Sequence, residues 1–330
     1  MTVTIGRRKL LTALGGTAAW PLVARAQQLA MPVVGFLNAA SFEDRREYLP
    51  AFHGGLRETG YVEGKNVELA YRWANGQNDR LPLLAAELVR LQVAVIVILE
   101  STQGALSAKV ATQTIPIVFM QGADPVGLVR SLNRPGGNLT GLDLLLSETA
   151  AKRLELLLQT VPTATLIGYL RNPTNPVFAE TETREVQVAA RTLGVRLLLL
   201  DATGPQEIDS AFATVAQERA NALMLSGDGL LNLRYRDQII ELAAKRAVPT
   251  MYVLREAALA GGLMSYGLDQ FDAWKQAGVY TGRILKGERP ADLPVQRVTK
   301  VQFVINLGAA KALGLTFPIP LLGRADEVIE

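Results

Sequence analysis

The sequence predicts an α/β protein of two similar lobes, each a doubly wound parallel sheet, joined by a multi-strand hinge. Three observations predict this class. From Pro32 onward, short strand-like runs alternate with longer amphipathic stretches, which is typical of parallel sheets with helical connections. The same order of strands and helices occurs twice along the 330 residues. A last strand-like run follows the second set and offers a further connection between the lobes.

The first set contains four strand-and-helix units. Its predicted strands are Pro32–Asn38, Asn66–Trp73, Val93–Leu99 and Pro116–Met120. Its predicted helices span Arg45–Thr59, a segment capped by Asp79 that reaches Leu91, and Ser101–Thr112. The run at 93–99 is almost purely aliphatic, which is typical of a parallel strand that is covered on both faces.

The second set repeats this order. Its predicted strands are Thr165–Asn172, Arg196–Asp201, Ala222–Ser226 and Pro249–Val253. Gly35-Phe-Leu matches Gly168-Tyr-Leu, and Ile115-Pro116 matches Val248-Pro249, and the two matches have the same separation along the chain. Equal offsets at two distant places indicate two lobes of similar construction, although matches this short also arise by chance.

The boundary between the lobes is predicted at the turn-rich segment Arg134–Gly141. Beyond the second set, a helix at Asp269–Lys286 and a strand at Gln302–Asn306 indicate that the chain crosses between the lobes again. Such a multiple connection permits hinge motion around a cleft. The predicted division is residues 1–26 as an export signal, 31–142 plus 267–298 as the first lobe, and 143–266 plus 299–330 as the second lobe.

Residues 1–26 have the three parts of a signal peptide. Basic residues, among them Arg7-Arg8, precede a short apolar run, and Ala24-Arg25-Ala26 is a small-x-small cleavage site. The arginine pair resembles a twin-arginine signal, while Gly6 and Leu10 depart from that pattern and leave the general secretory route open. An amphipathic N-terminal helix is the alternative. The sequence thus predicts cleavage near Ala26 and a periplasmic location.

Composition excludes several functional classes. There is no cysteine and a single histidine, His53, which excludes disulfides, a thiol nucleophile, an N-terminal lipid anchor and paired-histidine metal sites. The net charge of +3 falls to −1 without the four basic residues of the first 26, since that segment has no acid. A nearly neutral mature chain gives no electrostatic case for nucleic-acid binding.

Five stretches resemble the ABC-type substrate-binding family that includes bacterial tryptophan- and tyrosine-binding proteins. They are Val33–Leu37, Gly60–Val67, Thr114–Phe119, Asp124–Gly141 (through Asp-Pro-Val-Gly-Leu-Val and Pro-Gly-Gly-Asn-Leu-Thr-Gly) and Ile305–Thr316. The resemblance spans residues 31–325. It implies a type I periplasmic-binding-protein fold with three interlobe crossings, delivery of a solute to an inner-membrane ABC permease, and a freely diffusing protein, which we expect to be monomeric and without a cofactor.

Ligands of parallel α/β sheets bind beyond the carboxyl ends of the strands, where helix N-termini offer free N–H groups. The predicted ligand-binding residues on such loops are Asn38, Ser41, Ser101, Thr102, Gln121 and Asp124 in the first lobe, and Asn172, Asn175, Asp228, Tyr252 and Tyr266 in the second. Ser101 and Thr102 suit a carboxylate, and Asp228 suits an ammonium group.

Structural roles compete with these assignments. Ser101 is equally explained as a helix cap, Asp228 as a turn residue and Asn172 as an Asx-turn residue. The two tyrosines fit core packing better than pocket lining. His53 is expected on the surface or in the core, and Trp274 is expected to pack between the lobes. Phe36 would favour an aromatic ligand.

The motifs favour a binder over an enzyme. The sequence has no P-loop, no Gly-x-Gly-x-x-Gly after a strand and no Gly-x-Ser-x-Gly elbow. A carboxylate-only glycosidase lacks any fixed local motif and stays open as a minor alternative. A transcriptional regulator would need a DNA-binding segment ahead of the first lobe. We therefore predict capture of a small zwitterion, an amino acid or aromatic relative. A periplasmic sensor that presents its solute to a membrane receptor and a binder of aromatic carboxylates are the alternatives.

Overall fold

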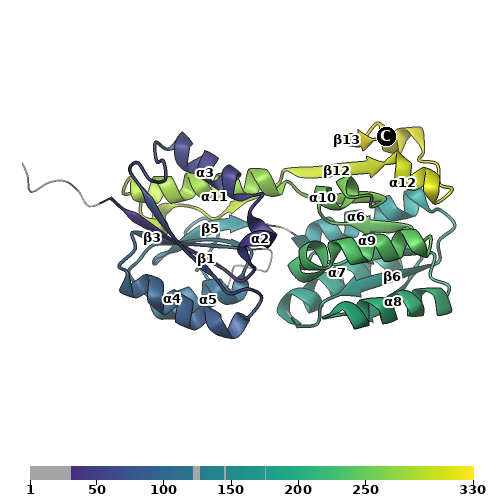
Figure 1. The fold of residues 1–330 in the computed structure, drawn as a ribbon, viewed down its shortest axis with the longest axis horizontal. Helices are drawn as coiled ribbons and strands as arrows, with labels where there is room; N and C mark the ends of the chain where they lie inside the picture. Colours follow the sequence, from purple (N-terminus) through teal and green to yellow (C-terminus); the bar gives the residue numbers. More distant parts are fainter. Residues whose placement is uncertain (1–30, 122–126, 145, 175) are drawn as a thin grey trace, which may run out of the picture.

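The computed structural model describes residues 31–121, 127–144, 146–174 and 176–330, so the predicted signal segment lies outside the described residues. These residues form two α/β lobes side by side (Figure 1). No helix of this part of the chain is long and apolar enough to cross a membrane.

The first lobe is a parallel sheet of six strands in the order β11-β5-β4-β3-β1-β2. The strands are β1 (Val33–Asn38), β2 (Glu68–Trp73), β3 (Val95–Leu99), β4 (Ile117–Gln121), β5 (Leu139–Asp143) and β11 (Gln296–Arg297). Its helices are α2 (Phe42–Arg45), α3 (Leu49–Glu58), α4 (Leu81–Arg90), α5 (Thr102–Ala111) and α11 (Gln270–Leu285).

Strand β3 is buried along its whole length, as its aliphatic sequence predicts. Alternate residues of this strand enter two different cores. Val97 packs into a core with α3 and α11, whereas Ile96 and Ile98 pack into a core with α4 and α5. Both faces of the sheet are therefore covered by helices, which is the doubly wound arrangement.

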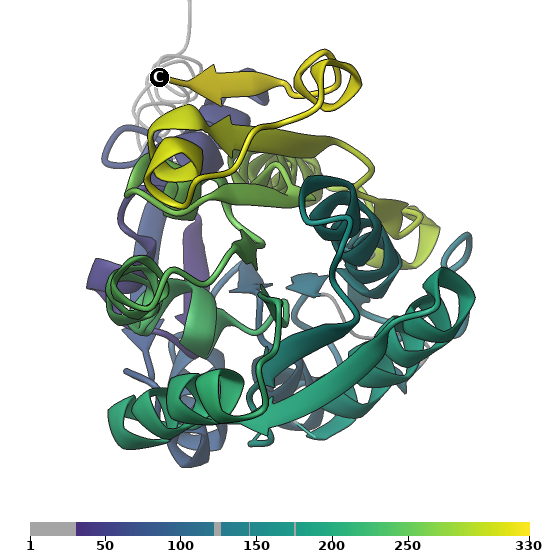
Figure 2. The same cartoon turned by 90° about the vertical axis from the view of Figure 1, so that its right-hand side faces the viewer.

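The second lobe is a sheet of seven strands in the order β13-β12-β10-β9-β8-β6-β7. The strands are β6 (Leu166–Arg171), β7 (Arg196–Asp201), β8 (Ala222–Leu225), β9 (Thr250–Tyr252), β10 (Met264–Leu268), β12 (Val301–Asn306) and β13 (Glu327–Ile329). The helices are α6 (Leu146–Thr160), α7 (Pro176–Leu193), α8 (Pro205–Gln217), α9 (Arg236–Lys245), α10 (Arg255–Leu259), α12 (Leu307–Ala312) and α13 (Ile319–Leu322). Figure 2, which faces this lobe, shows helices on both sides of its sheet.

The two sheets share one strand order. The run β2-β1-β3-β4-β5 of the first lobe corresponds to β7-β6-β8-β9-β10 of the second, and all neighbours within both runs are parallel. The first strands begin at Val33 and Leu166, which have the same separation along the chain as the matched Gly35 and Gly168. The sheets differ at one edge, where β12 is antiparallel to β10.

The chain crosses between the lobes three times. The crossings lie between β5 and α6, between β10 and α11, and between β11 and β12. In Figure 1 the last of them leads into β12, which starts next to the first lobe. Strand β5 belongs to the first sheet up to Asp143, and β10 belongs to the second sheet up to Leu268. The predicted division, by comparison, falls after Leu142, Tyr266 and Val298.

Two predicted helix starts differ from the structure. The helix expected over 45–59 begins only at Leu49, as α3, because α2 ends at Arg45, and Pro50 stands in the first turn of α3, where its missing N–H costs nothing. Asp79 does not cap α4: it lies within a 3-10 turn, Asn78–Arg80, and α4 begins after it with Pro82 in its first turn. In both places proline sets the beginning of the helix.

Candidate ligand-binding cavity between the lobes

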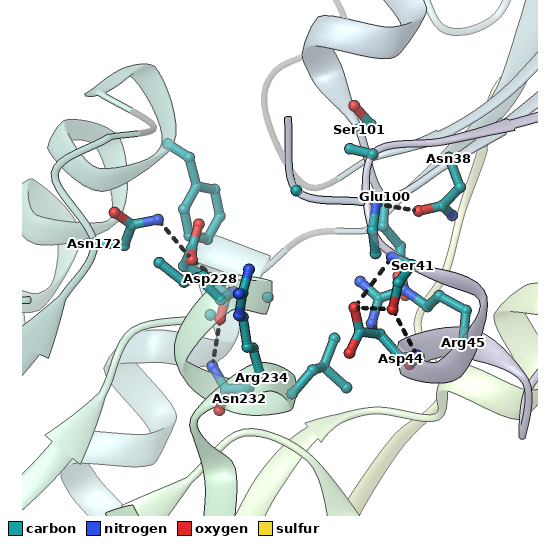
Figure 3. A pocket seen from close by; sticks show the side chains of 18 of the residues that line it. Asn38, Ser41, Asp44, Arg45, Glu100, Ser101, Asn172, Asp228, Asn232 and Arg234 are labelled. Carbon is teal, nitrogen blue, oxygen red and sulfur yellow. Dashed lines mark hydrogen bonds and ion pairs between the residues drawn. The ribbon is translucent and has the colours of Figure 1, made fainter. Parts of the chain in front are cut away.

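A cavity of about 770 Å³ lies between the lobes, at the carboxyl ends of the strands of both sheets. Its size is that of a small-molecule site. The first lobe contributes residues that follow β1, β3 and β4, and the second contributes residues that follow β6, β8 and β9. In Figure 3, Asn172, Asp228 and Arg234 face the side that carries Ser41, Asp44, Arg45 and Glu100.

Asn38 and Ser41 shape the backbone at the end of β1. The Asn38 Nδ2 donates to the carbonyl of Leu99 at 3.1 Å, and its Oδ1 accepts the Ala40 N–H at 2.9 Å. Ser41 forms a capping box with Asp44: the Ser41 N–H and hydroxyl both donate to Asp44 Oδ2. Asn38, Ser41 and Asp44 line the cavity, and their hydrogen bonds hold the loop after β1 and tie it to the end of β3.

Arg45 and Glu100 form an ion pair at the cavity wall. The Arg45 Nε lies 2.6 Å from Glu100 Oε2, and the two side chains are 6% and 14% exposed. Trp274 Nε1 donates to the other oxygen of Glu100 at 3.3 Å. Glu100 adopts a left-handed backbone, φ 61°, which a non-glycine residue adopts only at a cost of about 1–3 kcal/mol. With this backbone the carboxylate lies between Arg45 and Trp274.

Arg45 also reaches the second lobe. A Cβ built on Gly229 would lie 3.3 Å from Arg45 Nη2, which is tighter than an ordinary contact. The guanidinium of the first lobe therefore lies against the backbone of the second. A side chain at Gly229 would require the guanidinium to move by a few tenths of an ångström.

The predicted carboxylate donors occupy the start of α5. Ser101 Oγ accepts the Gly104 N–H at 2.9 Å, so it is the helix cap that the alternative interpretation described. Thr102 is the first residue of the helix and lines the cavity. Gln121, at the end of β4, lines the cavity and is 1% exposed.

The second lobe presents Asp228 on the loop Ser226–Gly229, which follows β8. Its Oδ1 accepts from Asn172 Nδ2 at 3.0 Å and from the Leu230 N–H at 2.9 Å. Asn232 Nδ2 donates to the carbonyls of Ser226 and Asp228, which closes the loop. Asn172 Oδ1 accepts the Thr174 N–H at 3.0 Å, the Asx turn that the sequence allowed.

Arg234 is a charged cavity residue that the sequence interpretation missed. It ends a π-helical turn, Leu230–Arg234, and its guanidinium carbon lies 5.8 Å from the centre of the Tyr235 ring. A Cβ on Gly76, in the first lobe, would lie 3.4 Å from Arg234 Nη1, so the side chain spans the gap between the lobes. One indication of this role was present in the sequence, because Arg234 follows the loop after β8. No sequence pattern predicts the π-helical turn that brings it to the cavity.

Two predicted residues lie away from this cavity. Tyr252 is 1% exposed in the core that α8 and α9 form with the second sheet. Tyr266 packs on the other face of that sheet, with its ring centre 6.2 Å from that of Phe303. Both have the core role that the sequence analysis gave as the alternative. Asp124 and Asn175 lie outside the described residues.

Aromatic residues of the first lobe are also placed differently from expectation. Phe36 is fully buried among rings of its own lobe and does not line the cavity. Trp274 packs against Phe36 and Tyr48 inside the first lobe, not between the lobes. Phe178, from α7 of the second lobe, lines the cavity instead and packs against the core of the first lobe. His53, a half-buried residue of α3, does not line the cavity, and its Nε2 lies at hydrogen-bond distance, 2.9 Å, from the Tyr71 hydroxyl.

The second-lobe wall of the cavity carries one charge of each sign. The charged side chains in the described lining are Asp44, Arg45, Glu100, Asp228 and Arg234. Arg45 and Glu100 neutralise each other, and Asp44 serves the capping box, all on the first lobe. Asp228 and Arg234 lie on the second lobe, and together they suit a molecule with an ammonium and a carboxylate. Within the described residues no group of three His, Cys, Asp or Glu side chains is placed to hold a metal ion.

Comparison with known proteins agrees with this architecture. The model of the family described as "ABC transporter substrate binding protein" matches residues 32–329. A tyrosine-binding protein of Clostridioides difficile (strain R20291) is 27% identical over 269 residues, which are 80% of this chain and 75% of that protein.

Solved structures give the same result. A conserved domain protein from Vibrio cholerae superposes with a TM-score of 0.82 and 29% identity, over 90% of this chain and 99% of that one. An ABC domain from Streptococcus pneumonia in complex with L-Trp superposes with a TM-score of 0.80 and 25% identity, over the same shares. The matched regions include both lobes and thus the cavity between them.

Proposed function

The chain belongs to the ABC transporter substrate binding protein family, and from this premise we propose that it captures an amino acid, preferably an aromatic one, in the interlobe cavity and delivers it to an inner-membrane permease. The observation that carries the proposal is the pair of opposite charges, Asp228 and Arg234, on one wall of that cavity. A free amino acid carries the matching pair, an ammonium and a carboxylate. The names of two relatives, a tyrosine-binding protein and a complex with L-Trp, support this ligand class.

Closure of the lobes completes the proposed site. The solute binds first to the second lobe through Asp228 and Arg234, while Phe178 provides an apolar surface beside them. Rotation about the three crossings then adds the first-lobe wall at Ser101, Thr102 and Gln121. Water leaves the cavity in this step, and each polar contact is strengthened in the less polar surroundings.

The cellular role follows from the same proposal. The family consists of substrate-binding proteins and is not a class of enzymes. The basic, apolar and small-residue pattern of residues 1–26 supports export and a periplasmic site of action. A sensor that presents the solute to a membrane receptor is the second function. Capture of the membrane partner by the ligand-loaded protein separates the two, because a transporter captures a permease and a sensor captures a receptor.

A thermal-shift screen of residues 27–330 tests the ligand class. Amino acids, aromatic acids without an amine, sugars and polyamines are added to the same protein. A ligand at 100 times its Kd stabilises the folded state by about 2.7 kcal/mol, so a true ligand raises Tm with concentration. We expect amino acids to raise it and the other three classes to have little effect. A rise with sugars or polyamines alone would contradict the proposal.

Two variants assign the charges. Asp228→Asn is expected to weaken binding of an amino acid by about tenfold or more, because it removes the charge that receives the ammonium. The matched control is Asp237→Asn, on a carboxylate of α9 that is 80% exposed and does not line the cavity. If an amino acid raises the Tm of Asp228→Asn as much as it raises the Tm of Asp237→Asn, Asp228 is not part of the site.

A further inference from the structure

A fully buried ion pair lies in the second lobe behind the cavity wall. Arg153 of α6 and Glu182 of α7 are both 0% exposed, and Arg153 Nη2 lies 2.5 Å from Glu182 Oε1. Arg153 Nη1 also donates to Thr149 Oγ1 at 3.0 Å. Neither ionic residue lines the cavity. A buried pair of this kind costs desolvation energy and is often no more stabilising than apolar residues of similar size, so its presence calls for another role.

The carboxylate of Glu182 is the meeting point of three elements. Its Oε2 accepts from the Tyr169 hydroxyl of β6 at 2.8 Å. Both of its oxygens accept from the Gly227 N–H, at 3.1 and 2.9 Å. Burial raises the pKa of the Glu182 carboxyl, and the Arg153 guanidinium and the donated hydrogen bonds oppose this effect. An apolar side chain in its place would offer Gly227 no acceptor.

Gly227 is the residue before Asp228, so the bond from Glu182 fixes the backbone that carries the predicted ammonium acceptor. The other anchors of the loop Ser226–Gly229 act on different atoms: Asn172 holds the Asp228 side chain, and Asn232 holds two carbonyls. The Ser226 N–H donates to the Leu170 carbonyl of β6 at 2.9 Å, and Glu182 is the side chain that holds the next loop N–H, that of Gly227.

We propose that Glu182 is a positioning residue for ligand binding: its buried carboxylate, neutralised by Arg153, holds Gly227 and thereby sets Asp228 for the ligand ammonium. This inference rests on the proposed function for the identity of the ligand. Arg153 and Glu182 do not touch the ligand. They act on affinity through the Gly227 N–H, as the supporting groups behind a binding site do when they fix the residues that contact the ligand.

The first measurement needs no ligand. In 15N-labelled protein, the Gly227 amide proton is expected far downfield, because it bonds to a charged acceptor. Glu182→Gln should move it upfield. Thr183→Val is the matched control: Thr183 is the next residue of α7, is 5% exposed, and its hydroxyl accepts from Arg171 at the end of β6 and not from the loop that contains Gly227. An unchanged Gly227 resonance in Glu182→Gln would overturn the proposal.

The second measurement is a double-mutant cycle by calorimetry with L-tyrosine as the probe. Glu182→Gln is expected to raise Kd about tenfold in the native background and less than about twofold in the Asp228→Asn background, because it acts through Asp228. Equal effects in both backgrounds, or an equal loss in Thr183→Val, would show a general structural role and overturn the proposal.

Folding and ligand identity are controlled separately. Glu182→Gln leaves Arg153 as an uncompensated buried cation, so the variant Arg153→Met/Glu182→Gln, without that charge, is measured in parallel. If the native protein does not bind L-tyrosine or any other amino acid, the proposed function fails. The Gly227 resonance then still decides whether Glu182 holds the loop.

Discussion

The two lobes have the same strand order but hold equivalent cavity loops in different ways. Leu37 pairs with Ile98 in the first sheet, and Leu170 pairs with Leu225 in the second. Glu100 and Gly227 stand the same short step beyond Ile98 and Leu225, so a glutamate and a glycine occupy matching places at the cavity. The next residues, Ser101 and Asp228, both line it.

In the first lobe the loop carries its own anchor. The Glu100 carboxylate forms an ion pair with Arg45 and accepts from Trp274, and the residue has a left-handed backbone. In the neighbouring strand β1, Phe36 packs against other rings. Its ring centre lies 5.5 Å from that of Phe52 and 5.9 Å from that of Trp274. The support of this wall is therefore aromatic packing with one ion pair above it.

In the second lobe the anchor comes from a helix below. Gly227 has no side chain, and the carboxylate of Glu182 reaches its N–H from α7. Tyr169 holds the strand position in β6 that Phe36 holds in β1, and its hydroxyl bonds that carboxylate. One topology thus accommodates two kinds of support, aromatic in one lobe and ionic in the other. Removing each support should have a different consequence.

The largest expected difference is between the two arginines. Arg153→Met leaves Glu182 buried without its counter-charge and should lower the free energy of unfolding by about 3–5 kcal/mol. Arg45→Met should cost less, about 1–2 kcal/mol, because Glu100 is partly exposed and keeps its bond from Trp274. Urea unfolding without ligand measures both. Equal losses would mean that the two ion pairs support their lobes equally.

A reciprocal exchange at the matched strand position is expected to have the next largest effect. Tyr169→Phe removes a hydrogen bond to a buried carboxylate and should cost about 1.5–3 kcal/mol. Phe36→Tyr places a hydroxyl among buried rings and should cost about 1–3 kcal/mol. Thermal unfolding compares them with Tyr71→Phe, whose hydroxyl is only partly buried on the edge strand β2. If either exchange is as mild as this control, the two lobes are less specialised than their contacts indicate.

The sequence predicted the architecture because strand order depends on local patterns. Periodicity located the first four strands of each lobe and β12, and a constant offset between the two halves of the chain matched the two sets. It did not locate β5, β10, β11 or β13, and the segment predicted as the boundary, Arg134–Gly141, runs into β5. The sequence also predicted which loops reach the cavity, since parallel strands end at one edge. The sequence did not predict which side chains of these loops point into the cavity. Val253 and Leu254 line the cavity, whereas Tyr252, one residue earlier, lies in the core.

The ion pairs could not be predicted from the sequence either, because their partners come from separate segments of the chain. Arg45 and Glu100 are distant along the chain, and Arg153 and Glu182 lie on two different helices. Neither pair has a fixed spacing that a motif could describe, because the fold brings Arg45 of α2 to Glu100 beyond β3 and packs α6 against α7. Arg234 was missed because a π-helical turn has no sequence signature comparable to a helix cap.

An acidic residue of the second lobe, Glu256 of α10, lies close to Glu47 of the first lobe. Burial raises the pKa of the Glu256 carboxyl above the ordinary 4.5, and the nearby Glu47 adds to this, whereas its own backbone N–H and the Arg255 guanidinium oppose it. The folded protein therefore binds more protons than the unfolded chain just above pH 4.5. Stability from this group is complete below that pH and is lost as pH rises through the raised pKa.

The smallest expected effect comes from Glu256→Gln, which removes this dependence. At pH 7 the variant should melt about 1–2 °C above the native protein, because a neutral amide avoids the cost of burying a charge between two lobes. Below about pH 4 the two should coincide, since both side chains are then neutral. Melting curves between pH 4 and 8 measure the difference, with Glu241→Gln on the exposed side of α9 as the control. A variant that melts below the native protein at pH 7 would mean that the charged carboxylate of Glu256 holds the lobes together, and that the contact between them is ionic like the interior of the second lobe.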